Sequence, residues 1–394
     1  MPEYKYLIVG GGMTAAAAVS GIRKADAQGS IGLISAEQDP PYNRPPLSKG
    51  LWKGEALDTI WRGTEKQNVV LHLGRRARSL EPSKKTATDD QGSVYSFEKL
   101  LLATGATPRR LPFGDDSIIY YRTLEDYRRL RALTQGSARV AVIGGGFIGW
   151  EVAAALAMNG KQVTMLFPEE AVGARIYPIE LARFLNDYYR QKGVNVIPGS
   201  MVINVEKKSQ GVLVKTRSHG EFPVDAVVAG IGVTPNAELA SSAGLKLDNG
   251  IVVDEFLRAS APYIYAAGDV ANFFNPALAR RLRVEHEDNA NTMGEQAGGT
   301  MAGQPTPYHH LPFFYSDLFE LGYEAVGELD PSLETVADWK DPHREGVVYY
   351  LRGGRVRGVL LWNVWGQVEA ARRLIAAPGP FLGPDLKGRL PRAE

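Results

Sequence analysis

The chain has 394 residues, which is enough for two or three domains with substantial cores. Its formal net charge is +1, so neither a large basic face for nucleic acid nor an acidic tail is indicated. It contains no cysteine, which excludes internal disulfides, thiolate metal sites, protein-held iron–sulfur clusters and a redox-active thiol in this polypeptide.

A glycine-rich loop follows the first apolar run of the chain. Residues 7–9 are Leu-Ile-Val, and Gly10-Gly11-Gly12-Met13-Thr14-Ala15 comes directly after them. A strand that feeds the pattern G-x-G-x-x-G/A into a helix packs a pyrophosphate against the helix N-terminus, and a side chain would block that approach. The next predicted strand, residues 31–35, is followed by Glu37, an acid suited to hydrogen-bond an adenosine ribose.

The same pattern returns at Gly144. Residues 140–143 are Val-Ala-Val-Ile, Gly144-Gly145-Gly146-Phe147-Ile148-Gly149 follows, and a second strand at 163–167 leads to Glu169. One such match is weak evidence, whereas two matches, each with its own acid, are strong evidence for two bound dinucleotides. A chain with two such sites most economically binds a flavin and a nicotinamide and passes a hydride between them.

Two apolar stretches resemble targeting or membrane segments. Residues 6–22 carry no charge and follow Lys5, as in a signal peptide, and residues 140–158 are about as long as a membrane span. Because the glycines fall at the strand ends and Glu151 interrupts the second stretch, both are predicted to be strand–loop–helix units. We therefore expect a cytoplasmic protein without a membrane segment.

The remaining patterns predict how these units are organised. Four prolines within residues 39–49 fix φ and disfavour a helix, so this segment is predicted to be a rigid loop that presents Arg44 and Lys49. Residues 264–269 are predicted to be a strand and a Gly-Asp turn that complete the first sheet, so that the second nucleotide domain is inserted in the first. From about residue 305 the pattern becomes α+β. It contains a hairpin turn at Gly353-Gly354, and Trp362 and Trp365 are expected in its core.

Residues 41–49, Pro-Tyr-Asn-Arg-Pro-Pro-Leu-Ser-Lys, resemble the oxygenase-coupled ferredoxin reductases and their relative, apoptosis-inducing factor. Residues 166–169, 283–286, 315–318, 322–327 and 361–363 are more similar to apoptosis-inducing factor, and the similarity extends from Tyr4 to about Ala376. It implies an α/β, glutathione-reductase-like fold with two Rossmann-like dinucleotide-binding domains. These are an FAD-binding domain (1–108 and 236–305) and an NADH-binding domain (109–235), followed by a C-terminal α+β interface domain (306–394).

The resemblance also implies which residues contact the cofactors. The expected FAD contacts are Gly10, Gly12, Thr14, Ala15, Glu37, Arg44, Lys49, Ala77, Thr104, Gly105, Arg122, Gly268, Asp269, Glu285, His286 and Tyr315. The expected NADH contacts are Gly144, Gly146, Phe147, Ile148, Gly149, Glu169, Arg175 and Gly232. The chain departs from the family pattern twice: alignment from Arg44 places Ala36 where apoptosis-inducing factor has its glutamate, and Tyr315 stands where relatives have tryptophan.

Four residues are expected to serve the chemistry: Lys49, Glu151, Phe147 and His286. The family places the lysine beside flavin N5, where a cation stabilises charge as hydride arrives, and pairs Glu151 with it. The alternatives are a surface lysine and a solvated acid in the first helical turn. Phe147 is either a core residue or an aromatic gate where nicotinamide meets flavin. His286 is either a site residue or a structural one, and its charge cannot be derived from the sequence.

Other patterns carry less chemistry. His309 and His310 lack a third ligand at metal spacing, so a loop and no metal are expected. The pairs Arg75-Arg76, Arg280-Arg281 and Arg372-Arg373 are expected to be solvated, and no nucleic acid partner is expected.

The sequence thus predicts an FAD-dependent NADH oxidoreductase that passes electrons to a small redox protein of the ferredoxin or rubredoxin type. NADH is preferred because Glu169 repels a 2′-phosphate, although the Arg175 guanidinium could offset that repulsion. The alternative is a redox-sensing interaction protein like apoptosis-inducing factor, with slow NADH oxidase activity and NADH-driven dimerisation. Either a monomer or a redox-dependent homodimer is expected.

Overall fold

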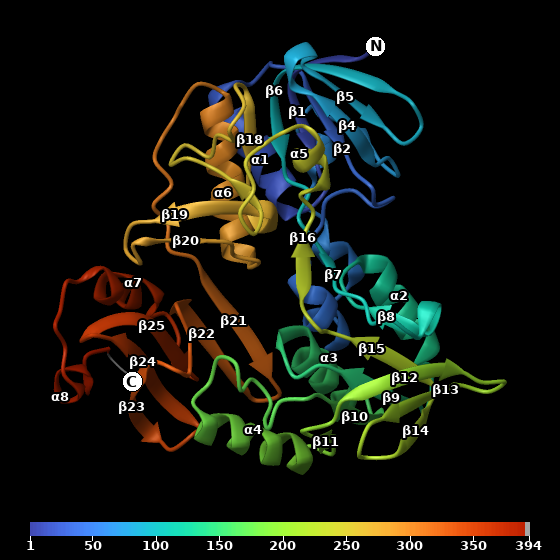
Figure 1. Cartoon of the computed structure of the whole chain (residues 1–394), viewed down its shortest axis with the longest axis vertical. Coiled ribbons are helices and arrows are strands. Elements are labelled where there is room, and N and C mark those ends of the chain that lie inside the picture. Colours follow the sequence, from blue (N-terminus) through green and yellow to red (C-terminus); the bar gives the residue numbers. More distant parts are fainter. Residues whose placement is uncertain (391–394) are drawn as a thin grey trace. The chain divides into compact units, whose positions relative to one another are not determined.

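The computed structural model describes residues 1–390 and forms two compact units (Figure 1). The first unit comprises residues 1–43, 57–107 and 234–312, and the second comprises residues 44–56, 108–233 and the chain from 313 onward. The chain leaves the first unit in β7 (Ala106–Pro108) and returns in β16 (Val233–Pro235), and these two strands pair with each other. No helix within residues 1–390 is both long and apolar enough to cross a membrane.

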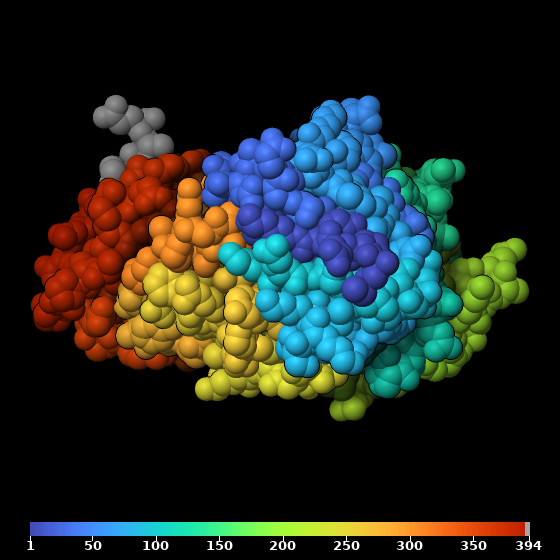
Figure 2. Space-filling model, turned by 90° about the horizontal axis from the view of Figure 1, so that it is seen from above, coloured from blue at the N-terminus to red at the C-terminus, as the bar shows by residue number. Residues whose placement is uncertain are grey.

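A seven-stranded sheet forms the centre of the first unit. The parallel strands are β3 (Val70–His72), β2 (Ile31–Ile34), β1 (Glu3–Val9) and β6 (Val94–Leu102), and β5 (Thr86–Asp89) and β4 (Ala77–Glu81) extend the sheet with antiparallel pairing. Residues Glu3 and Tyr4 pair with Ser96 and Phe97, so the dark-blue N-terminal residues lie beside the cyan ones in Figure 2. The predicted return of the chain is confirmed, because β18 (Ile264–Ala266) pairs with residues 100–102 of β6.

Two helices of the first unit lie side by side, α1 (Met13–Ala25) and α6 (Glu287–Met301) (Figure 1). Glycine permits their close approach: a Cβ on Gly298 would lie 2.1 Å from the carbonyl oxygen of Ala18. The unit also contains α5 (Glu238–Ser242) and the small sheet of β17 (Ile251–Val252), β19 (Ala271–Asn275) and β20 (Arg280–Leu282).

The second unit contains a second parallel sheet in the order β11 (Asn195–Ile197), β10 (Gln162–Leu166), β9 (Arg139–Ile143), β15 (Ala226–Ala229) and β8 (Ile118–Tyr120). Its helices include α2 (Leu124–Leu133), α3 (Phe147–Met158) and α4 (Ile179–Gln191). An antiparallel three-stranded sheet follows from β12 (Val202–Lys207), β13 (Val212–Thr216) and β14 (Glu221–Val224). The apolar side chains of β9, β10 and β15 form a buried core, as expected for a parallel sheet.

The C-terminal part of this unit is an antiparallel sheet in the order β21 (Phe313–Leu318), β22 (Leu321–Gly327), β25 (Arg355–Trp362), β24 (Glu345–Arg352) and β23 (Glu334–Asp341). Two helices follow, α7 (Val368–Ala376) and α8 (Gly383–Leu386). The predicted hairpin turn is confirmed, since Gly353 and Gly354 have φ of +57° and +72° between β24 and β25. Trp362 is buried as predicted, but the prediction for Trp365 is wrong: it lies beyond the last strand and is 47% exposed.

The expectation of a loop without helix at residues 39–49 is also wrong in part. Two short 3₁₀ helices, η1 (Pro45–Ser48) and η2 (Gly50–Trp52), frame Lys49. Pro45 and Pro46 occupy the first two positions of η1, where no backbone N–H is needed for a helical bond and where the fixed φ of proline fits.

Candidate active site

The first glycine loop joins β1 to α1. Gly10 has a φ of +123°, and a Cβ there would lie 2.0 Å from the carbonyl oxygen of Ala103. Gly12 is the N-cap of α1 and no side chain caps the helix. A helix start with bare backbone fits the phosphates of a dinucleotide, whose charge the helix dipole favours.

Other residues expected at the flavin lie in the same compact unit as this loop. Gly268 has a φ of +76°, and a Cβ on it would lie 2.3 Å from the Thr14 hydroxyl, so the turn to Asp269 lies against the start of α1. The Thr104 hydroxyl donates to the carbonyl of Asn236 at 2.7 Å, and Gly105 follows with a φ of +67°. The remaining residues of this set in the first unit are Ala15 on α1, Ala77 at the start of β4, Glu285, which pairs with Arg283 at 2.5 Å, and His286 at the N-cap of α6.

The acid after β2 has a fixed carboxylate. The Tyr42 hydroxyl donates to Glu37 Oε2 at 2.6 Å, and the Glu37 carbonyl accepts from the backbone of Gly74. Ala36, the alternative position, is exposed and has no side-chain acceptor for a ribose. This geometry supports Glu37, whose role remains a prediction.

The second glycine loop joins β9 to α3 with the same construction. Gly144 has a φ of +114°, and a Cβ there would lie 2.3 Å from the carbonyl oxygen of Gly230. A Cβ on Gly149 would lie 2.0 Å from the carbonyl oxygen of Gly144, whereas a Cβ on Gly146 would have no neighbour within 4 Å. The fold therefore requires glycine at positions 144 and 149, whereas the space beside Gly146 is open for a ligand.

The acid after β10 is paired within the protein. The Arg175 guanidinium forms an ion pair with the Glu169 carboxylate, and the two side chains are 80% and 22% exposed. The more exposed arginine can move away without unpacking the core, which would release the carboxylate. Gly232, the last residue expected at the nicotinamide cofactor, has a φ of +94° and its carbonyl accepts from the backbone of Arg109.

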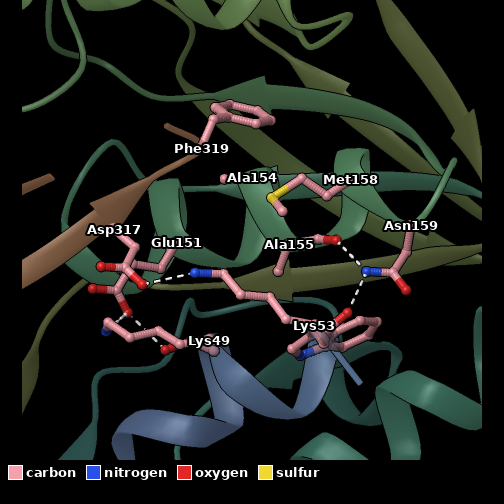
Figure 3. Close-up of a pocket in the computed structure, with 11 residues that line it drawn as sticks. Lys49, Lys53, Glu151, Ala154, Ala155, Met158, Asn159, Asp317 and Phe319 are labelled. Carbon is pink, nitrogen blue, oxygen red and sulfur yellow. Dashed lines mark hydrogen bonds and ion pairs between the residues drawn. The ribbon is translucent and has the colours of Figure 1, made fainter. Parts of the chain in front are cut away.

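Lys49 and Glu151 form a nearly buried ion pair in the second unit (Figure 3). Lys49 Nζ lies 2.6 Å from Glu151 Oε2, and the side chains are 12% and 5% exposed. Glu151 lies on α3, one turn beyond Phe147 at the start of the helix. The alternatives of a surface lysine and a solvated acid therefore do not describe these residues, while their chemical role remains a prediction.

Two side-chain hydrogen bonds to the Leu47 carbonyl fix the segment that carries Lys49. The Leu47 carbonyl accepts from Trp52 Nε1 at 2.8 Å and from the Tyr121 hydroxyl. Burial raises the pKa of Tyr121, which keeps its hydroxyl a donor. At the C-cap of α3, the Asn159 amide donates to the Trp52 carbonyl at 2.9 Å, so η2 is held to the helix that carries Glu151.

Four further predicted residues lie near this pair or its segment. Lys49 Nζ is 5.3 Å from the centre of the Tyr315 ring, which is within cation–π range. Arg44 donates to the carbonyl of Arg122 at 2.8 Å, which brings two of the expected cofactor contacts together. Phe147 is half-buried and packs edge-on against Trp150 and Phe314, with ring centres 4.9 and 5.4 Å away.

Two serines of the site were missed by the sequence analysis. Ser48 Oγ and Ser316 Oγ each donate to Glu151, at 2.6 Å to Oε2 and 2.6 Å to Oε1. Each serine is adjacent to a predicted residue, Lys49 or Tyr315. A single serine, however, belongs to no periodic or spaced pattern from which its role could be predicted. Only the packing of β21 against α3 brings Ser316 to the acid.

Comparison with known proteins agrees with these features. A family model described as pyridine nucleotide-disulphide oxidoreductase matches residues 4–294, and one for the C-terminal region of mitochondrion-associated apoptosis-inducing factor matches residues 297–345 and 338–377. The chain is 35% identical to "Apoptosis-inducing factor 1, mitochondrial" of Dictyostelium discoideum, over 95% of this chain and 78% of that protein. It is 32% identical to putidaredoxin reductase of Pseudomonas putida, over 97% and 94% of the two chains.

A solved structure shows the same fold. The reductase in the crystal structure of the covalent putidaredoxin reductase–putidaredoxin complex superposes with a TM-score of 0.89 at 30% identity, covering 95% of this chain and 94% of that one. The fold is therefore the α/β, glutathione-reductase-like fold with a C-terminal antiparallel sheet.

Proposed function

The chain belongs to the pyridine nucleotide-disulphide oxidoreductase family, as an NAD(P)H-dependent flavin oxidoreductase of the ferredoxin reductase and apoptosis-inducing factor group, and we propose that it takes hydride from NADH and passes electrons to a small redox protein. One observation carries this proposal. A nearly buried lysine–glutamate pair lies one helical turn from an open dinucleotide cradle, in the same compact unit.

The two cradles fit two cofactors. We assign FAD to the loop of Gly10 and Gly12 and NADH to the loop of Gly144 and Gly146, with domain boundaries at residues 108, 235 and 305. Both helix starts lack a side-chain cap, and a Cβ at Gly146 would occupy open space. When bound, the flavin would accept a hydride from nicotinamide and release its electrons to the acceptor.

The protein's part in this reaction is electrostatic and positional. The Lys49 ammonium holds a positive charge where negative charge develops, and its nearly dry surroundings strengthen that interaction. Glu151 orients the ammonium through their ion pair. The Phe147 ring, at the first position of α3, would stack where the nicotinamide arrives and exclude water, and His286 would contact the cofactor from the N-cap of α6.

The electron acceptor is proposed by analogy. The chain has no cysteine, so no dithiol of this chain can relay electrons from the flavin to a substrate. The solved structure of the relative contains putidaredoxin bound to its reductase, which favours a small one-electron protein as the acceptor here. We propose that such a protein, of the ferredoxin or rubredoxin type, receives the electrons.

A second candidate function is redox sensing. The match of the C-terminal region to the model of apoptosis-inducing factor favours it. In that case reoxidation is slow, and NADH drives dimerisation.

The test is an anaerobic titration of the purified yellow protein. We expect about one FAD per chain, full bleaching by NADH, and fast reoxidation by one-electron proteins in a panel that also holds quinones and oxygen. Slow reoxidation by every acceptor, with an NADH-dependent increase in mass by light scattering, would favour the second candidate. A colourless protein that takes up no added FAD would contradict both.

A further inference from the structure

Both carboxylate oxygens of Glu151 are engaged by donors from other segments. Oε2 contacts Lys49 Nζ and the Ser48 hydroxyl, each at 2.6 Å, and Oε1 contacts the Ser316 hydroxyl at 2.6 Å. The side chains of Ser48, Ser316 and Glu151 are all buried. We call Ser48 and Ser316 the serine clamp.

The direction of one hydrogen bond is fixed by an indole. Trp150 Nε1 can only donate, and it donates to Ser316 Oγ at 2.9 Å. Ser316 has a single hydroxyl proton, which it donates to Glu151 Oε1. Glu151 Oε2 accepts from the Lys49 ammonium and from the Ser48 hydroxyl, whose other acceptor is the Pro45 carbonyl at the longer distance of 3.4 Å. Three donors therefore converge on the two oxygens, an arrangement that matches an ionised carboxylate, which only accepts.

We propose that Ser316, together with Ser48, is a positioning residue that keeps Glu151 ionised and directed at Lys49. The inference rests on the proposed function for the role of Lys49, but the state of Glu151 can be measured independently of that function. Without Ser316, one acceptor oxygen loses its donor in a nearly dry site, so protonation of Glu151 becomes easier.

The groups that face Glu151 from neighbouring elements limit what else can titrate. They are Lys49, the ion pair of Lys53 with Asp317 at 2.9 Å, Tyr189 on α4 and Tyr323 on β22. Burial raises the pKa of Tyr189 and of Tyr323 well above the usual value, so both phenols stay neutral. Lys53 and Asp317 are partly exposed and form an ion pair with each other.

A small pocket borders the buried pair (Figure 3). Lys49, Lys53, Glu151, Met158 and Asp317 are among its lining residues, and it offers about 20 Å³ for the centres of water molecules. That volume is large enough for one water molecule. A water there would connect Glu151 with solvent, so protons would exchange during a pH titration.

The test compares Ser316→Ala with Ser316→Thr in the FAD-loaded full chain. Infrared difference spectra against Glu151→Gln isolate the carboxylate and carboxyl bands of this acid as the pH is lowered. We expect the carboxyl band of Ser316→Ala to appear at least about one pH unit higher than in wild type, because a hydrogen bond to a charged group is lost. Ser316→Thr, which keeps a hydroxyl, should restore the wild-type titration.

The pH dependence of flavin reduction is a second measure of the ionisation of Glu151. In Ser316→Ala the acid limb of flavin reduction by NADH should move to higher pH in parallel with the band. The control is Ser200→Ala, because Ser200 is buried and its hydroxyl has no hydrogen-bond partner among residues 1–390. Should Ser316→Ala not fold, Ser48→Ala removes the other donor and is measured in the same way.

The outcomes separate this inference from the proposed function. Unchanged titration of Glu151 in both alanine variants would overturn the serine clamp, whatever the activity. Failure of NADH to bleach the wild-type flavin would contradict the proposed function, and the infrared shift would still decide the clamp.

Discussion

Two acids that follow the glycine loops have different partners, and the difference bears on cofactor choice. Glu37 accepts from the hydroxyl of Tyr42, whereas Glu169 is paired with the guanidinium of Arg175. A carboxylate near the adenosine ribose repels a 2′-phosphate, and a mobile guanidinium can bind one. We therefore expect the ratio of the two cofactors' kcat/KM values to depend on both Glu169 and Arg175.

We predict that Arg175→Ala lowers kcat/KM for NADPH by roughly tenfold or more, since one charge-assisted contact is worth at least about 1.5 kcal/mol. The value for NADH should change little. The matched control is Arg183→Ala, which removes a similar exposed pair, with Glu170 at 3.4 Å. Equal losses for both cofactors in Arg175→Ala would show that this residue does not discriminate between them.

The glycines of the helices and loops have distinct structural roles. Gly10 and Gly144 have positive φ and close backbone neighbours, and glycines on α6 permit contact with α1. Gly146 and Gly299 have open space or ordinary contacts around the position of a Cβ. Substitution of a glycine with close backbone neighbours should destabilise the fold, while substitution of Gly146 should weaken the binding of a ligand.

The contact between α1 and α6 gives a prediction of stability. Gly298→Ala should lower the free energy of unfolding by about 1–3 kcal/mol, because the new Cβ would lie 2.1 Å from the carbonyl oxygen of Ala18. Gly299→Ala, on the same helix with its nearest neighbour at 3.9 Å, should raise it by about 0.5–1 kcal/mol through helix propensity. Urea unfolding of the two variants measures both values, and a similar loss in both would refute the packing argument.

The second loop gives a prediction of binding. Gly146→Val should weaken NADH binding by at least about tenfold while FAD content and the melting temperature stay near wild type, because a Cβ there meets no protein atom within 4 Å and would enter the space that we propose for the pyrophosphate. The matched variant Gly149→Val should instead reduce the yield of folded protein, since its Cβ would lie 2.0 Å from a carbonyl oxygen. Unchanged NADH affinity in Gly146→Val would place the cofactor elsewhere.

Sequence patterns predicted the elements that depend on local chemistry. The strand–glycine–helix units and the turn at Gly353-Gly354 follow from apolar runs and glycine conformations. The 3₁₀ helices around Lys49 were not predicted from the four prolines. Proline is disfavoured in the interior of a helix, but it is tolerated in the first turn, where Pro45 and Pro46 lie. Ser316 and Trp150 could not be predicted as a pair, since they are 166 residues apart and meet only through tertiary packing.

At the scale of the molecule, residues 44–56 and the C-terminal sheet belong to the same compact unit as the second glycine loop. The fold of this unit brings segments that are distant in the sequence together, and with them Lys49, Glu151, Phe147 and Tyr315. We propose that this unit uses the ion pair to promote hydride transfer from NADH to the flavin.

Anaerobic stopped-flow bleaching of the flavin by NADH tests that claim without a known acceptor. Lys49→Ala and Glu151→Gln should each slow the limiting rate by about 10²–10³-fold, as for loss of one oriented electrostatic partner, with NADH affinity nearly unchanged. The double variant should be little slower than either single one, because the pair acts as a unit. Wild-type rates in both single variants, with FAD fully bound, would contradict the account.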